Sequence, residues 1–174
     1  MTEETIHAIQ ALEEVNLANE RALRLLSHRL RSEKELRARL LEKEFTPAVI
    51  DGVIEHLRNI GMIDDAVFAR TFVHDQQLRK PAGRKHLQHQ LLLKGVAKRI
   101  VENVLDEELP KSEEQSLALT AAMKHVKRHR VKSVDPAKQR QQLTHYLMRR
   151  GFSWAIISPV LKKIFHSEHL PMEE

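Results

Sequence analysis

The hydrophobic positions of the chain follow a pattern that occurs three times. The first copy spans 36–54, and its apolar positions recur at 87–105 and again at 143–161. In each copy a stripe at helical spacing is followed by a short turn and then by a second stripe at i, i+1, i+4 and i+5. The pattern predicts two consecutive helices in each copy, and three ordered copies indicate an internal repeat.

The turn between the two predicted helices also repeats. Gly95 and Gly151 stand where a residue in the left-handed conformation would end the first helix of the second and third copies. Glu44 holds that place in the first copy, where it should cost stability because a side chain disfavours this conformation.

Capping signals mark where several helices begin. Ser32 and Ser112 each open a capping box, and Thr46 and Asp135 each precede a proline that suits the first helical position. Pro159 lies inside the last apolar stripe, so the final helix either bends there or starts later with Ser158 as its cap.

A further helix is predicted before each pair, at 20–29, 65–79 and 113–131, because three helices can enclose a small core that two cannot. Residues 4–16 predict an additional N-terminal helix with Ile6, Ile9 and Leu12 as its apolar face. We therefore expect an all-α protein of three tandem three-helix repeats in an elongated array, preceded by an N-terminal helix. The expected segments are an N-terminal extension (1–18), three repeats (19–62, 63–109 and 110–167) and a C-terminal tail (168–174).

Composition agrees with the helical prediction and narrows the compartment. The 174 residues include only 5 glycines and 6 prolines, and aromatic residues are 4%, whereas good helix formers are common. The absence of cysteine excludes disulfides, thiol catalysis and thiolate metal sites. No apolar run approaches the ~20 residues that span a bilayer, and the N-terminus lacks the features of a signal peptide. We expect a soluble cytoplasmic protein.

Charge is distributed in blocks that the net value of +5 conceals. Residues 1–18 sum to −4 and residues 102–114 to −5, while 78–100 sum to +7 and 118–150 to +8. Blocks of this kind can be solvated helix faces, or they can attract a polyanion such as nucleic acid. Their number favours a nucleic-acid or acidic-protein partner.

Catalytic and metal-binding motifs are missing. The sequence has no glycine-rich phosphate loop and no Gly-x-Ser-x-Gly elbow. The pairs His86/His89 and His125/His129 lie among basic residues, which favours solvated histidines over a metal site. Asp64 and Asp65 are better explained as a helix cap than as metal ligands. We expect no catalytic residue, no bound metal and no cofactor.

Residues that read nucleic-acid bases are scarce. Tyr146 and Trp154 are the only Tyr and Trp, and Trp154 lies beside an apolar stripe. Few aromatic side chains are therefore expected to stack on single-stranded bases. No helix carries the Asn, Gln and Arg pattern that reads base edges. Any contact with DNA is expected to be to phosphates, without sequence preference.

Three segments resemble the RecX family. The run from Arg31 to Leu36 resembles its R-S-x-x-E-L opening. The segment from Gly61 to Phe72 resembles G-[YF]-[IL]-D-D-x-x-F-A-x-x-[FY], and the segment from Gly83 to Val96 resembles G-x-x-x-[IL]-x-x-E-L-x-x-K-G-[IV]. The resemblance covers roughly 20–165 and is looser in the third repeat. Met62 departs from the usual aromatic residue and Gln90 from a frequent acid.

The resemblance implies a non-enzymatic regulator of the RecA recombinase, and we expect it to be a monomer. RecX-like proteins bind the RecA–single-stranded DNA filament and restrain its ATPase, strand-exchange and co-protease activities in DNA repair, recombination and the SOS response. A row of basic helical repeats suits such a partner.

Basic residues at repeated positions are the candidate contacts with the filament and its DNA. Lys43, Lys94 and Arg150 occupy equivalent places in the three copies. Solubility alone would also explain any one of these side chains. The predicted binding surface consists of Arg29, Arg31, Arg37, Arg70, Arg79, Lys80, Arg84, Lys85, Lys94, Arg149 and Arg150.

Two other functions fit the sequence. A stand-alone regulator could use one repeat as a helix-turn-helix, which predicts a specific DNA site. A structural adaptor would bind a protein partner in the absence of DNA. An enzyme is disfavoured, because no group of residues supports catalysis.

Overall fold

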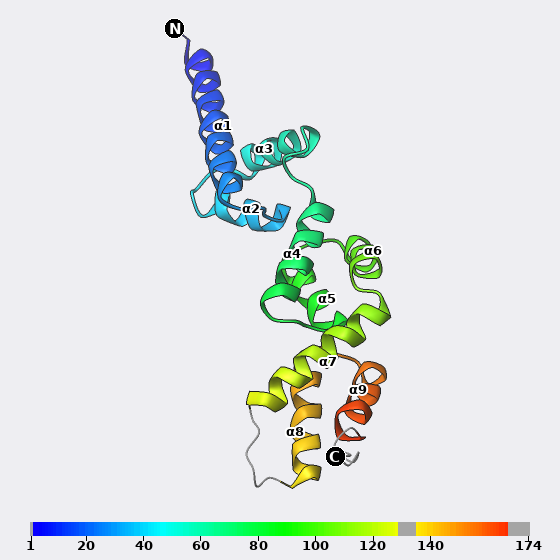
Figure 1. Ribbon diagram of the computed structural model, residues 1–174. Coiled ribbons are helices and arrows are strands. Elements are labelled where there is room, and N and C mark those ends of the chain that lie inside the picture. Colours follow the sequence, from blue (N-terminus) through cyan, green and yellow to red (C-terminus); the bar gives the residue numbers. More distant parts are fainter. Residues whose placement is uncertain (1, 129–134, 167–174) are drawn as a thin grey trace. The chain divides into compact units, whose positions relative to one another are not determined.

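A computed structural model describes residues 2–128 and 135–166, apart from the side chains at positions 4 and 6. This part of the chain forms nine helices and no strand (Figure 1). The helices are α1 (Glu3–His28), α2 (Glu33–Leu41), α3 (Pro47–Asn59), α4 (Asp65–Arg79), α5 (Arg84–Leu93), α6 (Lys98–Glu108), α7 (Lys111–Arg128), α8 (Pro136–Arg149) and α9 (Trp154–His166). They follow one another as three sets of three, which confirms the prediction of an all-α protein built from three-helix repeats.

The chain divides into two compact units. Unit 1 contains residues 1–69 and 91–101, and unit 2 contains residues 70–90 and 102–174. Repeat 1 (α1 to α3) therefore belongs to unit 1, repeat 3 (α7 to α9) belongs to unit 2, and repeat 2 contributes residues to both.

Repeat 1 encloses a core formed by one face of each of its helices. Helix α1 contacts both α2 and α3, which also contact each other. Small alanines on α1 allow the close approach, and branched side chains on the other two helices fill the centre. The buried cluster comprises Ala18, Ala22, Leu36, Leu40, Ile50, Val53, Ile54, Leu57 and Ile63.

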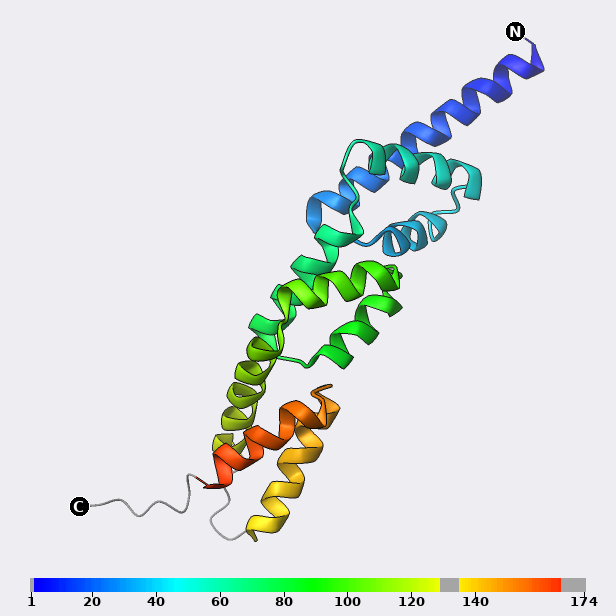
Figure 2. The same cartoon turned by 90° about the vertical axis from the view of Figure 1, so that its right-hand side faces the viewer.

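Repeat 3 repeats this construction with α7, α8 and α9, each of which contacts the other two. Figure 2 shows α8 and α9 side by side, in yellow to red. The alanines again come from the first helix of the repeat. The buried cluster comprises Ala118, Ala121, Ala122, Leu143, Leu147, Phe152, Ile156, Ile157, Val160 and Leu161.

Helix α1 corrects the predicted N-terminal organisation. The segments 4–16 and 20–29 are not two helices but one helix of 26 residues, because no glycine, proline or other stop signal interrupts the run. Its N-terminal half extends beyond α2 and α3 in both views (Figures 1 and 2). There Ile9 and Leu12 are 46% and 62% exposed, so this predicted apolar face has no partner among the described residues. The third member of that face, at position 6, has a side chain outside the description.

The turns after the middle helices adopt the predicted left-handed conformation. Gly95 and Gly151 have φ values of 86° and 80°, and Glu44 has a φ of 63°. Glu44 is the only non-glycine residue with positive φ in the described chain. The expected cost of a side chain at this position is therefore present in repeat 1.

Most of the predicted helix starts are confirmed. Ser32 caps α2 by accepting a hydrogen bond from the Glu35 amide at 3.2 Å, and Asp135 caps α8. Asp64 caps α4, because its carboxylate accepts from the Ala66 and Val67 amides at 2.7 and 3.1 Å.

One prediction about helix starts is wrong, and one of the two alternatives for the last helix is excluded. Helix α7 begins at Lys111, directly after Pro110, so Ser112 lies inside the helix and is not its cap. Helix α9 begins at Trp154 and contains Pro159, so Ser158 is not a cap either. The predicted end of the helix 113–131 extends past Arg128, outside the described residues.

Candidate binding surface

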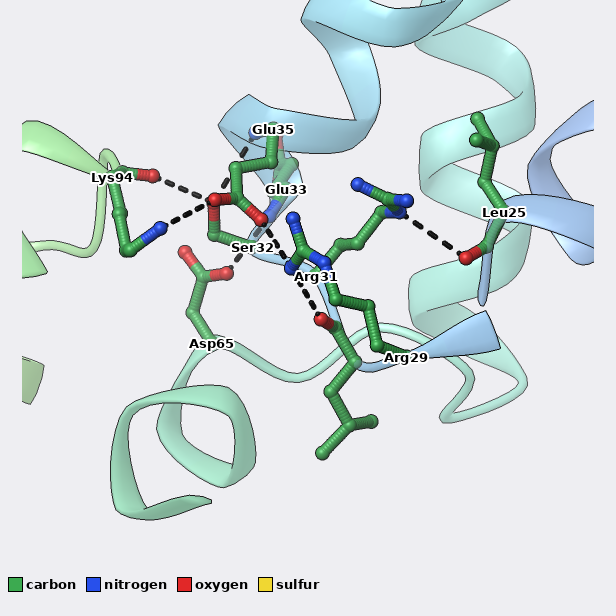
Figure 3. A network of polar contacts seen from close by, with 9 residues as sticks. Leu25, Arg29, Arg31, Ser32, Glu33, Glu35, Asp65 and Lys94 are labelled. Atoms are coloured by element: carbon green, nitrogen blue, oxygen red, sulfur yellow. Dashed lines mark hydrogen bonds and ion pairs between the residues drawn. The ribbon is translucent and has the colours of Figure 1, made fainter. Parts of the chain in front are cut away.

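The start of α2 makes hydrogen bonds with residues of the next repeat. We call this region the first junction (Figure 3). The Ser32 hydroxyl donates to the Lys94 carbonyl oxygen at 2.6 Å. The Glu33 amide donates to the Asp65 carboxylate at 2.9 Å. These bonds tie the N-terminus of α2 in repeat 1 to the start of α4 and to the turn after α5, all within unit 1.

The start of α5 makes an equivalent set of contacts in unit 2, which we call the second junction. The Gly83 amide donates to the Arg150 carbonyl oxygen at 2.8 Å. The Arg84 amide donates to the Glu114 carboxylate at 2.9 Å. The repeat pattern places Gly83 at the position of Ser32 and Arg150 at the position of Lys94. Both junctions thus use a carboxylate on the next first helix and a carbonyl in the next turn to bind a helix N-terminus.

Close packing explains the glycines in these turns. A Cβ on Gly95 would lie 2.5 Å from the Lys34 side chain, and a Cβ on Gly151 would collide with the backbone of His86. Gly83 has the same constraint, because a Cβ there would meet the backbone of Gly151.

The two junctions differ in their charges. At the first, the Lys94 ammonium pairs with the Glu35 carboxylate at 2.6 Å, and Arg29 pairs with the same carboxylate at 2.8 Å. Burial opposes the ionisation of Glu35, but the hydrogen bonds from Lys94 and Arg29 outweigh it and lower its pKa. The first junction is therefore a region of compensated charge.

At the second junction, His86 occupies the position that Glu35 holds at the first. Burial lowers the pKa of His86, and the nearby charges of Arg150, His89 and Lys80 lower it further. Arg150 is 92% buried, being 8% exposed, and its guanidinium donates to the Pro81 carbonyl oxygen. Burial also lowers the pKa of Arg150. Positive groups at this junction are thus less compensated than at the first.

Four of the predicted basic residues hold unit 1 together. Arg29 and Lys94 share Glu35, as described above. Arg31 donates to the Leu25 carbonyl oxygen at the end of α1, at 3.1 Å. Arg37 pairs with Glu33 at 3.0 Å and with Asp51. These side chains have partners inside the fold, so their role in repeat packing explains them without a ligand.

Three more of the predicted residues have such a role in unit 2. Arg70 pairs with Glu107 at 3.0 Å, Arg84 pairs with Asp106 at 2.6 Å, and Arg150 is the buried residue of the second junction.

The remaining four predicted residues, Arg79, Lys80, Lys85 and Arg149, are exposed. Their side chains make no hydrogen bond or ion pair with any residue of the described ranges 2–128 and 135–166. All four belong to unit 2 and lie within two residues of Pro81, Arg84 or Arg150 along the chain. The bond from Gly83 to Arg150 brings these two segments together. We call these four residues the basic set of the second junction.

Other chemistry is not supported by the described residues. They contain no group of three or more His, Asp or Glu side chains arranged to hold a metal ion. Asp64 and Asp65 are engaged as a helix cap and as the acceptor of the Glu33 amide. His129, the second residue of one predicted histidine pair, lies outside the description. Among the residues described, no helix is both long and apolar enough to span a bilayer.

Comparison with known proteins identifies the repeats. Residues 18–57, 64–105 and 112–161 match the family descriptions "RecX, first three-helix domain", "second three-helix domain" and "third three-helix domain". The chain belongs to the RecX family.

Individual relatives agree. A "Regulatory protein RecX" from Chlorobium phaeobacteroides (strain BS1) is 37% identical over 146 residues, which cover 84% of this chain and 92% of the relative. One from Clostridium acetobutylicum is 32% identical over 153 residues, 85% of this chain and 69% of the relative. The crystal structure of RecX from Lactobacillus salivarius has the same fold, with a TM-score of 0.79 over 89% of this chain and 99% of that chain, at 22% identity. A regulatory role is therefore supported for this RecX family member.

Sequence reasoning missed two features of the site. Asp65 and Glu114 accept the helix amides at the two junctions, and their signal was available, because both lie at the start of a first helix, four residues before a buried alanine. Trp154 is 57% exposed, although its neighbourhood suggested a core position. The sequence does indicate this exposure, because Trp154 directly precedes the apolar stripe and is not one of its members.

Proposed function

We propose that this protein regulates a RecA recombinase by binding the RecA–single-stranded DNA filament and restraining its ATPase, strand-exchange and co-protease activities. Family membership supports the regulatory role. The observation that carries the more specific proposal is the basic set of the second junction, four exposed cations whose charges are not used within the described fold.

Charge supports a polyanionic partner. The described residues from position 115 onward contain nine Lys or Arg side chains against Asp135 as the single acid. A surface of this kind attracts phosphates at long range and releases counterions when it binds them. The binding is expected to weaken steeply as salt concentration rises.

The test is the ATPase activity of RecA on single-stranded DNA, with this protein titrated in. We expect the rate to fall as the protein is added, and the inhibition to weaken between low and moderate salt. An unchanged ATPase rate at saturating protein would contradict the proposal.

Two companion measurements separate the other candidate functions. Binding to one selected duplex sequence much more tightly than to random duplex would favour a stand-alone DNA-binding regulator. Binding to RecA that is equally strong without DNA would favour a protein adaptor. The proposal predicts neither result.

A further inference from the structure

Trp154 is an aromatic side chain that the fold does not require where it stands. It is the first residue of α9, and its side chain is 57% exposed. The equivalent residues that open α3 and α6 are Pro47 and Lys98, which are also exposed. The repeat therefore places this position at the surface, and Trp154 is not among the residues packed on the buried cluster of repeat 3.

The other aromatic residues are not available in the same way. Tyr146 is partly buried and stacks on His125, with ring centroids 4.2 Å apart. All five phenylalanines are buried or partly buried. Trp154 is thus the one Phe, Tyr or Trp side chain of the chain that is exposed.

The repeat also places Trp154 close to the basic set. At the first junction, Ala97 and Ile100 at the start of α6 line one hollow together with Lys34 and Gly95. The residues of the second junction equivalent to Ala97, Ile100 and Lys34 are Ser153, Ile156 and Lys85. The Gly83 amide donates to the Arg150 carbonyl oxygen, and a Cβ on Gly151 would meet His86, so the turn directly before Trp154 lies against the start of α5, where His86 follows Lys85.

Local charge distinguishes this surface from its counterpart. At the first junction, carboxylates of Glu33, Asp64 and Asp65 line the hollow. At the second, Arg84 replaces Glu33, and Glu114 is used as the acceptor of the Arg84 amide. Glu113, at the start of α7, is the remaining exposed acid of that segment. Exposed cations therefore outnumber the remaining carboxylate at the second junction.

An exposed aromatic ring beside unpaired cations is the arrangement that binds single-stranded nucleic acid. Bases stack on the ring without regard to their identity, and cations hold the adjoining phosphates. We propose that the second junction binds single-stranded DNA, that Trp154 stacks on a base, and that Arg79, Lys80, Lys85 and Arg149 contact the phosphates. This inference rests on the proposed function and assigns the DNA component of the filament to this surface.

Trp154 provides its own probe, because it is the only tryptophan in the chain. Its fluorescence is measured while an oligothymidylate is added, and binding is followed in parallel by the anisotropy of a labelled oligonucleotide. We expect quenching that saturates together with the anisotropy change. Heparin, a polyanion without bases, should displace the oligonucleotide and restore the fluorescence.

Variants separate stacking from charge. Trp154→Ala should weaken oligothymidylate binding roughly tenfold, whereas Trp154→Phe should retain most of it, and both should keep the wild-type circular dichroism spectrum. Lys80→Glu with Lys85→Glu should weaken both oligothymidylate and heparin. Lys124→Glu with Lys127→Glu, the same change of charge on α7, is the matched control and should have a smaller effect on both.

Three results would overturn the inference. The first is oligonucleotide binding without a change in Trp154 fluorescence. The second is a fluorescence change with RecA alone that DNA does not alter, which would make this a protein contact. The third is no binding of the oligonucleotide at all. RecA ATPase measured with the wild-type protein and with Trp154→Ala separates this failure from that of the proposed function. Inhibition by the wild type without oligonucleotide binding would contradict only the stacking site, whereas no inhibition by the wild type would contradict the proposed function.

Discussion

The two junctions perform the same structural task with different chemistry. In each, the N-terminus of a middle helix is bound by a carboxylate and by a carbonyl oxygen from the next repeat (Figure 3 shows the first). The first junction neutralises its cations with Glu35. The second has His86 in that place, buries Arg150 and leaves four nearby cations exposed. The repeat thus keeps its packing bonds in both copies, while only the second junction leaves this set of cations exposed and unpaired.

The largest effect on stability is expected for Gly83→Ala, at the second junction. A Cβ at this position meets the backbone of Gly151 and Phe152, which cannot move as a side chain can. We expect the free energy of unfolding to fall by about 3 kcal/mol, measured by urea denaturation. Gly52→Ala is the control, because nothing lies within 4 Å of a Cβ there. It should raise stability by about 0.5–1 kcal/mol. Equal effects of the two variants would contradict the close approach of Gly83 to the backbone of Gly151 and Phe152.

Removal of the acid at the first junction should have the next largest effect. Glu35→Gln loses charge-assisted hydrogen bonds from Lys94 and Arg29 at a largely buried site, and we expect a loss of about 2 kcal/mol. Glu42→Gln, which breaks an exposed pair with Arg39, should cost no more than about 0.5 kcal/mol. If Glu35→Gln cost as little as the control, charge compensation would not hold the first junction.

Repeat 1 allows a test of why the turn glycines are needed. Glu44→Gly should raise stability by about 1 kcal/mol, because glycine adopts a φ of 63° without the strain of a side chain. Glu44→Ala keeps the Cβ and should bring no comparable gain. Thermal denaturation of both variants gives the answer, and an equal gain from alanine would remove backbone strain as the explanation.

Much of this architecture could be predicted from local sequence. The predictable features depend only on residues close together in the sequence, so their pattern is visible there. They are the apolar stripes, the turn residues Gly95 and Gly151, and the cap at Ser32. The continuous α1 could not be predicted in the same way, because two amphipathic stretches joined without a stop signal show the same pattern as two separate helices.

The candidate site was less predictable, because pairing depends on residues distant in the sequence. Lys94 pairs with Glu35, and Arg84 pairs with Asp106, 59 and 22 positions away. A basic residue that recurs in every copy therefore suggested a shared binding surface, whereas Lys94 and Arg150 serve the packing between repeats. Only the three-dimensional contacts distinguish these cations from the basic set of the second junction.

The smallest expected effect is a difference in pH dependence. The lowered pKa of His86 means that the folded protein resists protonation while the unfolded chain accepts a proton near pH 6.5. Stability at the second junction should therefore decrease as pH falls below about 6.5. Glu35 has a lowered pKa and stabilises its charged form, so its contribution is complete above its ordinary value of 4.5 and is lost only as pH falls through the folded pKa.

Unfolding free energies measured from about pH 7.5 down to about pH 2.5 resolve this difference. His86→Gln should remove part of the decrease that begins below pH 6.5, and Glu35→Gln should remove part of the decrease at more acidic pH. Identical pH profiles for wild type and His86→Gln would show that the histidine at the second junction is not perturbed.

We infer that the second junction carries the binding surface, whereas the first serves the fold. The most direct test of this inference compares two charge reversals in the RecA ATPase assay on single-stranded DNA. Lys80→Glu with Lys85→Glu should raise the concentration needed for half-inhibition by about tenfold without a change in unfolding free energy. Lys124→Glu with Lys127→Glu, which alters the net charge equally, should have a clearly smaller effect. Equal losses of inhibition from the two pairs would contradict a binding surface at the second junction.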